Sequence, residues 1–138
     1  MNQVITDTVD FLLLTPAAPY VCPTRLTYRT FDPLCVTARF PQQFPHVSAP
    51  TWTLGRDLLA EGLHTPVGQG DVRVRPLGRD RTLVELHSHH GAAALTARTA
   101  ELARFLDTAY ALVPRGHEGP FIDWTALTDL QVPDPTDM

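Results

Sequence analysis

The chain has 138 residues, of which 43% are hydrophobic and 19% are charged, and its net charge is −4. This length suits a single domain over residues 1–138, and no apolar run approaches the length of a membrane span. All the basic residues are arginines and they form no dense stripe, so the composition disfavours sequence-independent binding to nucleic acid. The short apolar run at residues 11–14 lacks the basic start of a signal peptide, which predicts a cytoplasmic protein.

The first half of the chain predicts four strands, because apolar and polar residues alternate along it. These strands cover residues 4–14, 26–31, 34–40 and 51–54. A turn at Asp32 and Pro33 joins the second and third strands in a hairpin. In the third strand, Leu34 is expected on the same face as Val36, Ala38 and Phe40.

A loop and a short helix complete this half. The segment Pro41–Pro50 contains three prolines and predicts a loop before the fourth strand. Residues 55–62 are good helix formers, and Gly62 is a natural C-terminal cap. We therefore expect a helix directly after the fourth strand.

The second half predicts three strands and two helices. The strands cover residues 71–75, 82–88 and 92–97. Apolar residues from Leu102 to Val113 then follow helical spacing until Pro114 and Gly116 stop the helix. Asp123 is a good N-cap for a last helix through residue 130. About seven mostly antiparallel strands with three helices make the fold class α+β, and the two halves look like loose repeats of a strands-then-helix unit.

Few residues suggest chemistry. His87 and His89 would share one strand face, but no further ligand completes a metal site with them and His90, so a solvated turn is favoured and a metal site is the alternative. Cys22 and Cys35 have no paired spacing, and a structural role is favoured for both. Because nucleophile and phosphate-loop motifs are also missing, we predict no catalytic residue, no cofactor and no enzyme.

The segment from Trp52 to Val74 resembles the signature block of the SsgA-like protein family. In that family a Trp-bearing strand runs into R-D-L-L-x-x-G, here residues 56–62, and a Pro/Gly connector leads to G-D-V-R-V, here residues 70–74. Looser similarity covers an L-x-Y…D-P hairpin at residues 26–33 and a V-P-x-G ending at residues 113–116. The proline-rich loop and the histidine cluster are not part of the family pattern.

This resemblance implies a small actinomycete regulator of sporulation-specific cell division without enzymatic activity. Family members help to localise the tubulin-like GTPase FtsZ to future septa, or act in septal peptidoglycan handling and spore maturation. The implied partners are FtsZ, other septum proteins or a paralogous SsgA-like protein, at the division septum. The resemblance also implies a homotrimer with a Whirly-like architecture of two pseudo-repeated halves.

The alternative is a single-stranded nucleic-acid-binding module of Whirly-like fold. That function would require Arg73 and Arg75 to converge with Arg29 and Arg39 on one surface. The acidic net charge disfavours this alternative.

Four residues of the signature block are the candidate partner-binding residues. Arg56, Glu61, His64 and Asp71 have no evident packing role, and we expect them to be exposed. A solvated helical face is the alternative explanation for them.

Overall fold

The computed structural model describes residues 2–41, 50–89 and 91–122. Two predictions fall wholly or partly outside this range: the loop over residues 41–50 and the last helix over residues 123–130. Among the described residues, no helix is long and apolar enough to cross a membrane.

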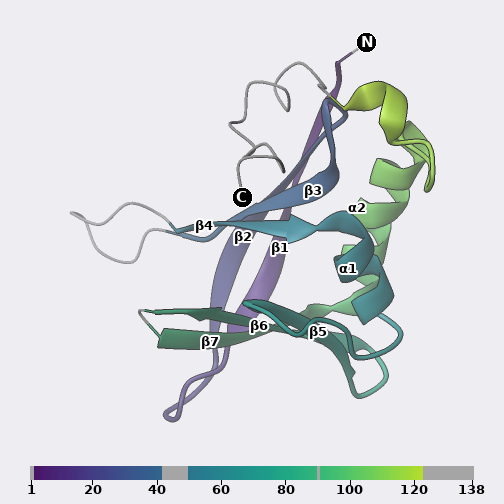
Figure 1. The fold of residues 1–138 in the computed structure, drawn as a ribbon. Coiled ribbons are helices and arrows are strands. Elements are labelled where there is room, and N and C mark those ends of the chain that lie inside the picture. The colour runs from purple at the N-terminus through teal and green to yellow at the C-terminus, as the bar shows by residue number, and fades with distance from the viewer. Residues whose placement is uncertain (1, 42–49, 90, 123–138) are drawn as a thin grey trace, which may run out of the picture.

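Seven antiparallel strands form one sheet in the order β4-β3-β2-β1-β7-β6-β5 (Figure 1). The elements in chain order are β1 (Val4–Leu13), β2 (Tyr20–Arg29), β3 (Asp32–Arg39), β4 (Thr51–Gly55), α1 (Arg56–Gly62), β5 (Val72–Leu77), β6 (Arg81–Ser88), β7 (Gly91–Arg98) and α2 (Thr99–Leu112). This order confirms the predicted α+β class and the strands-then-helix pattern of each half. The described part has two α-helices instead of three, followed by a short 3-10 turn, Gly119–Phe121.

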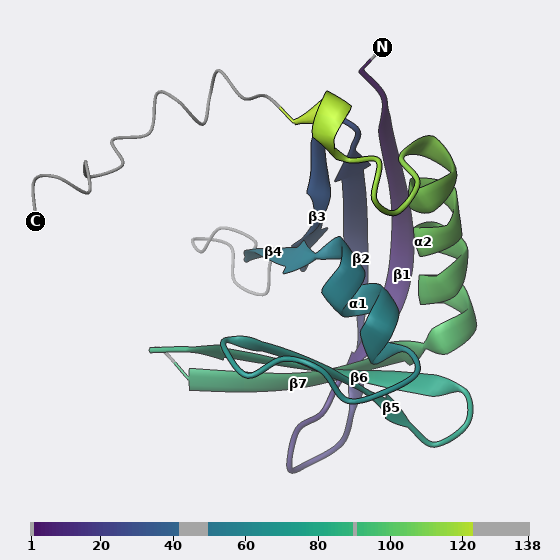
Figure 2. The same ribbon diagram turned by 45° about the vertical axis from the view of Figure 1, so that its right-hand side comes forward.

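The sheet consists of two groups of strands, β1–β4 and β5–β7, joined through β1 and β7. Two residue pairs of β1 and β7 form this junction, Leu12 with Thr96 and Leu13 with Leu95, and the backbone N–H of Leu14 donates to the carbonyl of Ala94 (2.9 Å) beside them. Figures 1 and 2 show that the two groups run in different directions and that both helices lie in the angle between them. The core therefore lies between the helices and one face of the sheet, while the other face carries no helix of the described chain.

Alternation along β1 places Val9 and Phe11 in the core, where both are almost fully buried. The prediction for Leu34 is wrong, because this side chain is 50% exposed. The register of β2 and β3 shifts between Tyr28 and Arg29, so that Arg29 pairs with Asp32. This irregularity takes Leu34 out of the regular alternation of β3.

Gly62 was predicted as a C-terminal cap, but its role is different. It does not have a positive φ, and the cap residue after α1 is Leu63 in right-handed helical conformation. A Cβ atom at Gly62 would lie 2.2 Å from Cγ1 of Val74 on β5. Gly62 is therefore needed because helix and strand approach so closely that no side chain fits between them.

Candidate functional site

Arg56 is buried, although exposure was predicted. It is the first residue of α1 and its exposed fraction is 0%. One terminal nitrogen donates to the hydroxyl of Tyr28 (3.0 Å) and to the carbonyl of Val113 (2.6 Å), and the other makes an ion pair with Glu118 (2.7 Å). The guanidinium carbon lies 4.1 Å from the ring centre of Tyr110. The planar fork of donors thus joins β2, α1 and the end of α2 at one point, and the side chain is not available at the surface.

A second layer covers this arginine. The hydroxyl of Tyr110 donates to Asp57 (2.5 Å) and accepts from Arg115 (3.0 Å), which also lies 3.5 Å from the carboxylate of Asp57. Burial, followed by the hydrogen bond to Asp57, raises the pKa of Tyr110 to about 12. Tyr110 therefore remains a hydrogen-bond donor at neutral pH. We call Arg56, Tyr28, Asp57, Tyr110, Val113, Arg115 and Glu118 the arginine hub.

Glu118 makes the arginine hub sensitive to acid. Its pKa is lowered from the ordinary value of 4.5, first because its own backbone N–H donates to the carboxylate, and further because of the N–H of Gly116 and the charge of Arg56. A carboxyl group whose pKa is lower in the folded than in the unfolded state stabilises the fold at pH values above its unfolded pKa. This contribution is lost as the pH falls through its folded pKa. At pH values below about 4.5 we expect the melting temperature to decrease as the pH is lowered. The substitution Glu118→Gln should flatten this part of the profile.

Melting curves recorded from pH 7 down to pH 3 by circular dichroism measure this effect. The matched control is Asp107→Asn, because Asp107 is an exposed carboxylate of α2 without an ion pair in the described part of the chain. That variant should keep the wild-type profile. Parallel profiles for wild type and Glu118→Gln would contradict the assignment.

The other three candidate residues are exposed, as predicted. Glu61 and His64 lie together at the end of α1, where the backbone N–H of His64 donates to the carbonyl of Glu61 (3.0 Å). Asp71 lies elsewhere, before β5, and its carbonyl accepts the backbone N–H of His87 (2.8 Å). The structure therefore brings two of the four together, and their role as partner contacts stays a prediction.

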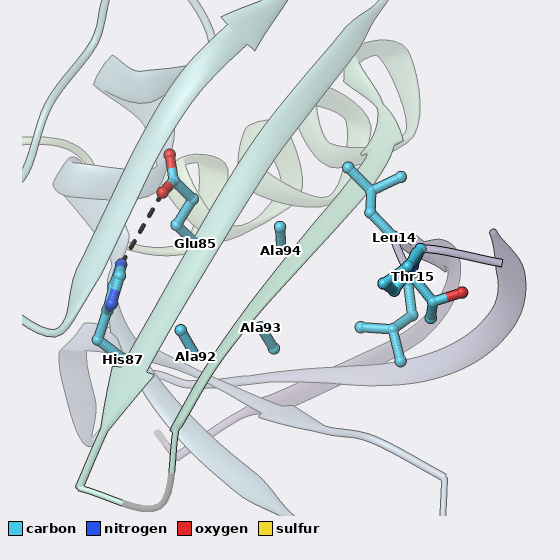
Figure 3. Close-up of a pocket in the computed structure, with 9 residues that line it drawn as sticks. Leu14, Thr15, Glu85, His87, Ala92, Ala93 and Ala94 are labelled. Atoms are coloured by element: carbon cyan, nitrogen blue, oxygen red, sulfur yellow. Dashed lines mark ion pairs between the residues drawn. The ribbon is translucent and has the colours of Figure 1, made fainter. Parts of the chain in front are cut away.

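His87 lines a hollow of about 440 Å³ beside the junction of β1 and β7. Figure 3 shows Glu85 and His87 along one side, Leu14 and Thr15 along the other, and three alanines between them, Ala92, Ala93 and Ala94. The small alanine side chains leave the space, and an ion pair of 3.8 Å between His87 and Glu85 lies at its rim. An apolar floor with one histidine and one carboxylate at its edge suits a side chain of a partner better than a reacting group.

Nothing in the described range completes a metal site or an activated nucleophile. No three His, Cys, Asp or Glu side chains there could hold a metal ion, and His90 lies outside that range. Burial raises the pKa of both Cys22 and Cys35, so both thiols are protonated at neutral pH and are weak nucleophiles.

Comparison with known proteins identifies similar chains. A family model described as "Streptomyces sporulation and cell division protein, SsgA" matches residues 22–118. The sporulation-specific cell division protein SsgB of Kineococcus radiotolerans is 40% identical over 125 residues, with 86% of this chain and 74% of the relative covered. SsgB of Streptomyces coelicolor is 42% identical over 107 residues, with 73% and 74% covered. A crystal structure of an SsgA-like sporulation-specific cell division protein from Thermobifida fusca is similar at a TM-score of 0.80 and 34% identity, over 92% of this chain and 94% of that one.

Proposed function

Because this chain belongs to the SsgA family of sporulation and cell division proteins, we propose that it is a non-enzymatic regulator of sporulation-specific cell division. The observation that carries this proposal is the family match over residues 22–118. The matched range begins in β2 and ends at Glu118, so it contains all of the arginine hub. The family match thus covers the part of this chain that the arginine hub joins together.

The proposed activity is that of an adaptor working through protein surfaces. It would help to localise FtsZ or other septum and spore-wall machinery, without a cofactor, in the cytoplasm at the division septum. The proposed partners are division proteins and a paralogous SsgA-like protein. Glu61 and His64 are the proposed contact residues, because they are exposed side by side on the turn that ends α1.

We further propose that residues 1–138 act as one domain with a Whirly-like two-half architecture and assemble as a homotrimer. Two repeats of strands followed by a helix support the two-half architecture, since β1–β4 precede α1 and β5–β7 precede α2.

The alternative of single-stranded nucleic-acid binding loses support from the positions of the arginines. Arg39 is on β3 and Arg73 is on β5, and strands β2, β1, β7 and β6 lie between them in the sheet. Arginines at such separate places do not form the continuous basic surface that this function requires. We therefore favour a protein partner.

Complementation tests the adaptor function. The chain, fused to a fluorescent protein, is expressed in a Streptomyces coelicolor strain that lacks SsgB, and septa are counted in sporulating hyphae with a membrane dye. We expect septation to recover and the fusion to co-localise with FtsZ. The surface change Glu61→Arg combined with His64→Ala should reduce septation at unchanged protein level, whereas Arg79→Ala, at the exposed β5–β6 turn, should not. A folded and abundant chain that restores no septa and no localisation would contradict the proposal.

A further inference from the structure

Threonines and arginines cover the face of β1–β4 that carries no helix. Along these strands they alternate with the buried core residues, so they project to the side of the sheet opposite the core. Strand pairing aligns them in two rows across the sheet. The first row is Thr6, Thr27, Thr37 and Thr53, and the second row is Thr8, Arg25, Arg39 and Thr51. With Arg29, which donates to Thr37 (3.2 Å), these residues make up what we call the threonine–arginine face.

This face carries like charges at facing positions of neighbouring strands. Arg25 and Arg39 are direct partners in the β2–β3 register and both are exposed. Like charges at opposed positions of neighbouring strands destabilise a sheet. In the part of the chain that the structure describes, neither arginine forms an ion pair. On the same side of the sheet, Asp10 lies two positions beyond Thr8 and opposite Pro23, and Asp32 is the register partner of Arg29, so the three arginines outnumber these two aspartates. The threonine–arginine face therefore has a positive charge that an acidic segment would neutralise.

The acidic charge of the chain is concentrated in its last residues. The eleven arginines all precede residue 116 and are balanced by eleven acidic residues up to Glu118. The remaining four aspartates, Asp123, Asp129, Asp134 and Asp137, fall in residues 123–138, which contain no basic residue. The whole net charge of −4 thus belongs to this terminal segment.

We propose that residues 123–138 dock on the threonine–arginine face of their own chain. Sixteen residues span up to about 55 Å when extended, which is longer than the diameter of about 37 Å expected for a domain of this size. Each exposed ion pair is weak, but the covalent connection raises the effective concentration of the segment to the millimolar range. This connection favours the chain's own acidic segment over a separate acidic molecule. The aspartates then pair with Arg25, Arg29 and Arg39, and the threonine hydroxyls bond to the peptide groups of the segment.

Cys35 supplies a natural reporter of this contact. It is a free, half-buried cysteine on the same face of β3, two residues before Thr37. The other cysteine, Cys22, is 4% exposed on the core side. A docked segment would shield Cys35 from a thiol reagent and leave the reaction rate of Cys22 unchanged.

The experiment compares maleimide labelling of Cys35, read by mass spectrometry for each cysteine, in the full chain and in a chain that ends at Ile122. If a few exposed ion pairs favour docking by about fivefold, removal of the segment raises the labelling rate about fivefold. Salt at about 1 M, where the Debye length is about 3 Å, should raise the rate of the full chain similarly. Addition of the synthetic peptide 123–138 to the shortened chain should slow the labelling again.

A double variant, Arg25→Gln with Arg39→Gln, separates docking from a simple field effect. Loss of positive charge near a thiol raises its pKa and slows labelling, whereas loss of docking speeds it. We expect faster labelling of the full-length double variant, and no change for Arg73→Gln with Arg75→Gln on β5, which is the matched control. Equal rates for the full and shortened chains, or slower labelling of the first double variant, would overturn the proposal. A rate in the full chain that falls with rising protein concentration would likewise overturn the intramolecular contact.

Discussion

The substitution Arg56→Met is expected to lower the free energy of unfolding by about 3–5 kcal/mol, as for other buried charges deprived of one partner. Methionine fills a similar length of space but donates no hydrogen bond. The hydroxyl of Tyr28, the carbonyl of Val113 and the carboxylate of Glu118 would lose the donors they share. Buried polar groups without a partner are costly, so the loss exceeds that of a single hydrogen bond. Urea unfolding at neutral pH, followed by circular dichroism, measures this loss of stability. We expect a lower midpoint urea concentration and an unchanged dependence of the unfolding free energy on urea concentration.

Two further variants show whether the geometry of the guanidinium matters. Arg56→Lys keeps the charge but has no planar fork, so it should restore only part of the stability. Arg75→Met removes an exposed arginine, 49% exposed, whose ion pair with Glu85 is 3.7 Å long, and such surface pairs contribute at most about 1 kcal/mol. If Arg56→Met and Arg75→Met unfolded at the same urea concentration, the arginine hub would not hold the fold together as described.

The substitution Gly62→Ala should also destabilise the chain, by about 2 kcal/mol net. Alanine favours a helix over glycine by about 1 kcal/mol. Against this gain, the new Cβ would lie 2.2 Å from Cγ1 and 2.4 Å from Cβ of Val74, and overpacking of this kind costs up to about 3 kcal/mol. The steric cost is larger than the gain in helix propensity, so the substitution lowers the free energy of unfolding. The measurement is again the midpoint of urea unfolding.

The matched control is Gly70→Ala, because a Cβ at Gly70 would meet nothing within 4 Å. The double variant Gly62→Ala with Val74→Gly removes both Val74 atoms that the new Cβ would meet, and a favourable coupling between the two changes identifies the clash as the cause. A Gly62→Ala chain as stable as wild type would show that helix and strand can separate without cost.

Local patterns in the sequence predicted the order of the elements well, because alternation and helical spacing depend on residues a few positions apart. They failed at Arg56. Its partners Tyr28, Val113 and Glu118 are 28, 57 and 62 residues away in the chain. An arginine at the start of a short helix has the same local pattern whether it is solvated or buried. The useful signal was that the signature block and the V-P-x-G ending occur in one chain, and these are the segments that Arg56 joins.

The errors at Leu34 and Gly62 have the same origin. A register shift between β2 and β3 and a close approach of α1 to β5 arise from packing between segments. In each case the residue type was compatible with a simpler local explanation, namely strand alternation for leucine and a cap for glycine. Of the candidate contact residues, Glu61 and His64 were correctly expected to be exposed, since both are polar and the apolar residue between them, Leu63, is the one that turns into the core.

The distance along the chain between Arg56 and its partners also affects the order of events during synthesis. When β1–β4 and α1 have left the ribosome, the guanidinium still lacks Val113 and Glu118, which are made about sixty residues later. We therefore expect the nascent first half to remain incompletely folded until the end of α2 has emerged. Although the two halves repeat one architecture, we expect that neither matures alone and that the chain reaches its final fold in one late cooperative step.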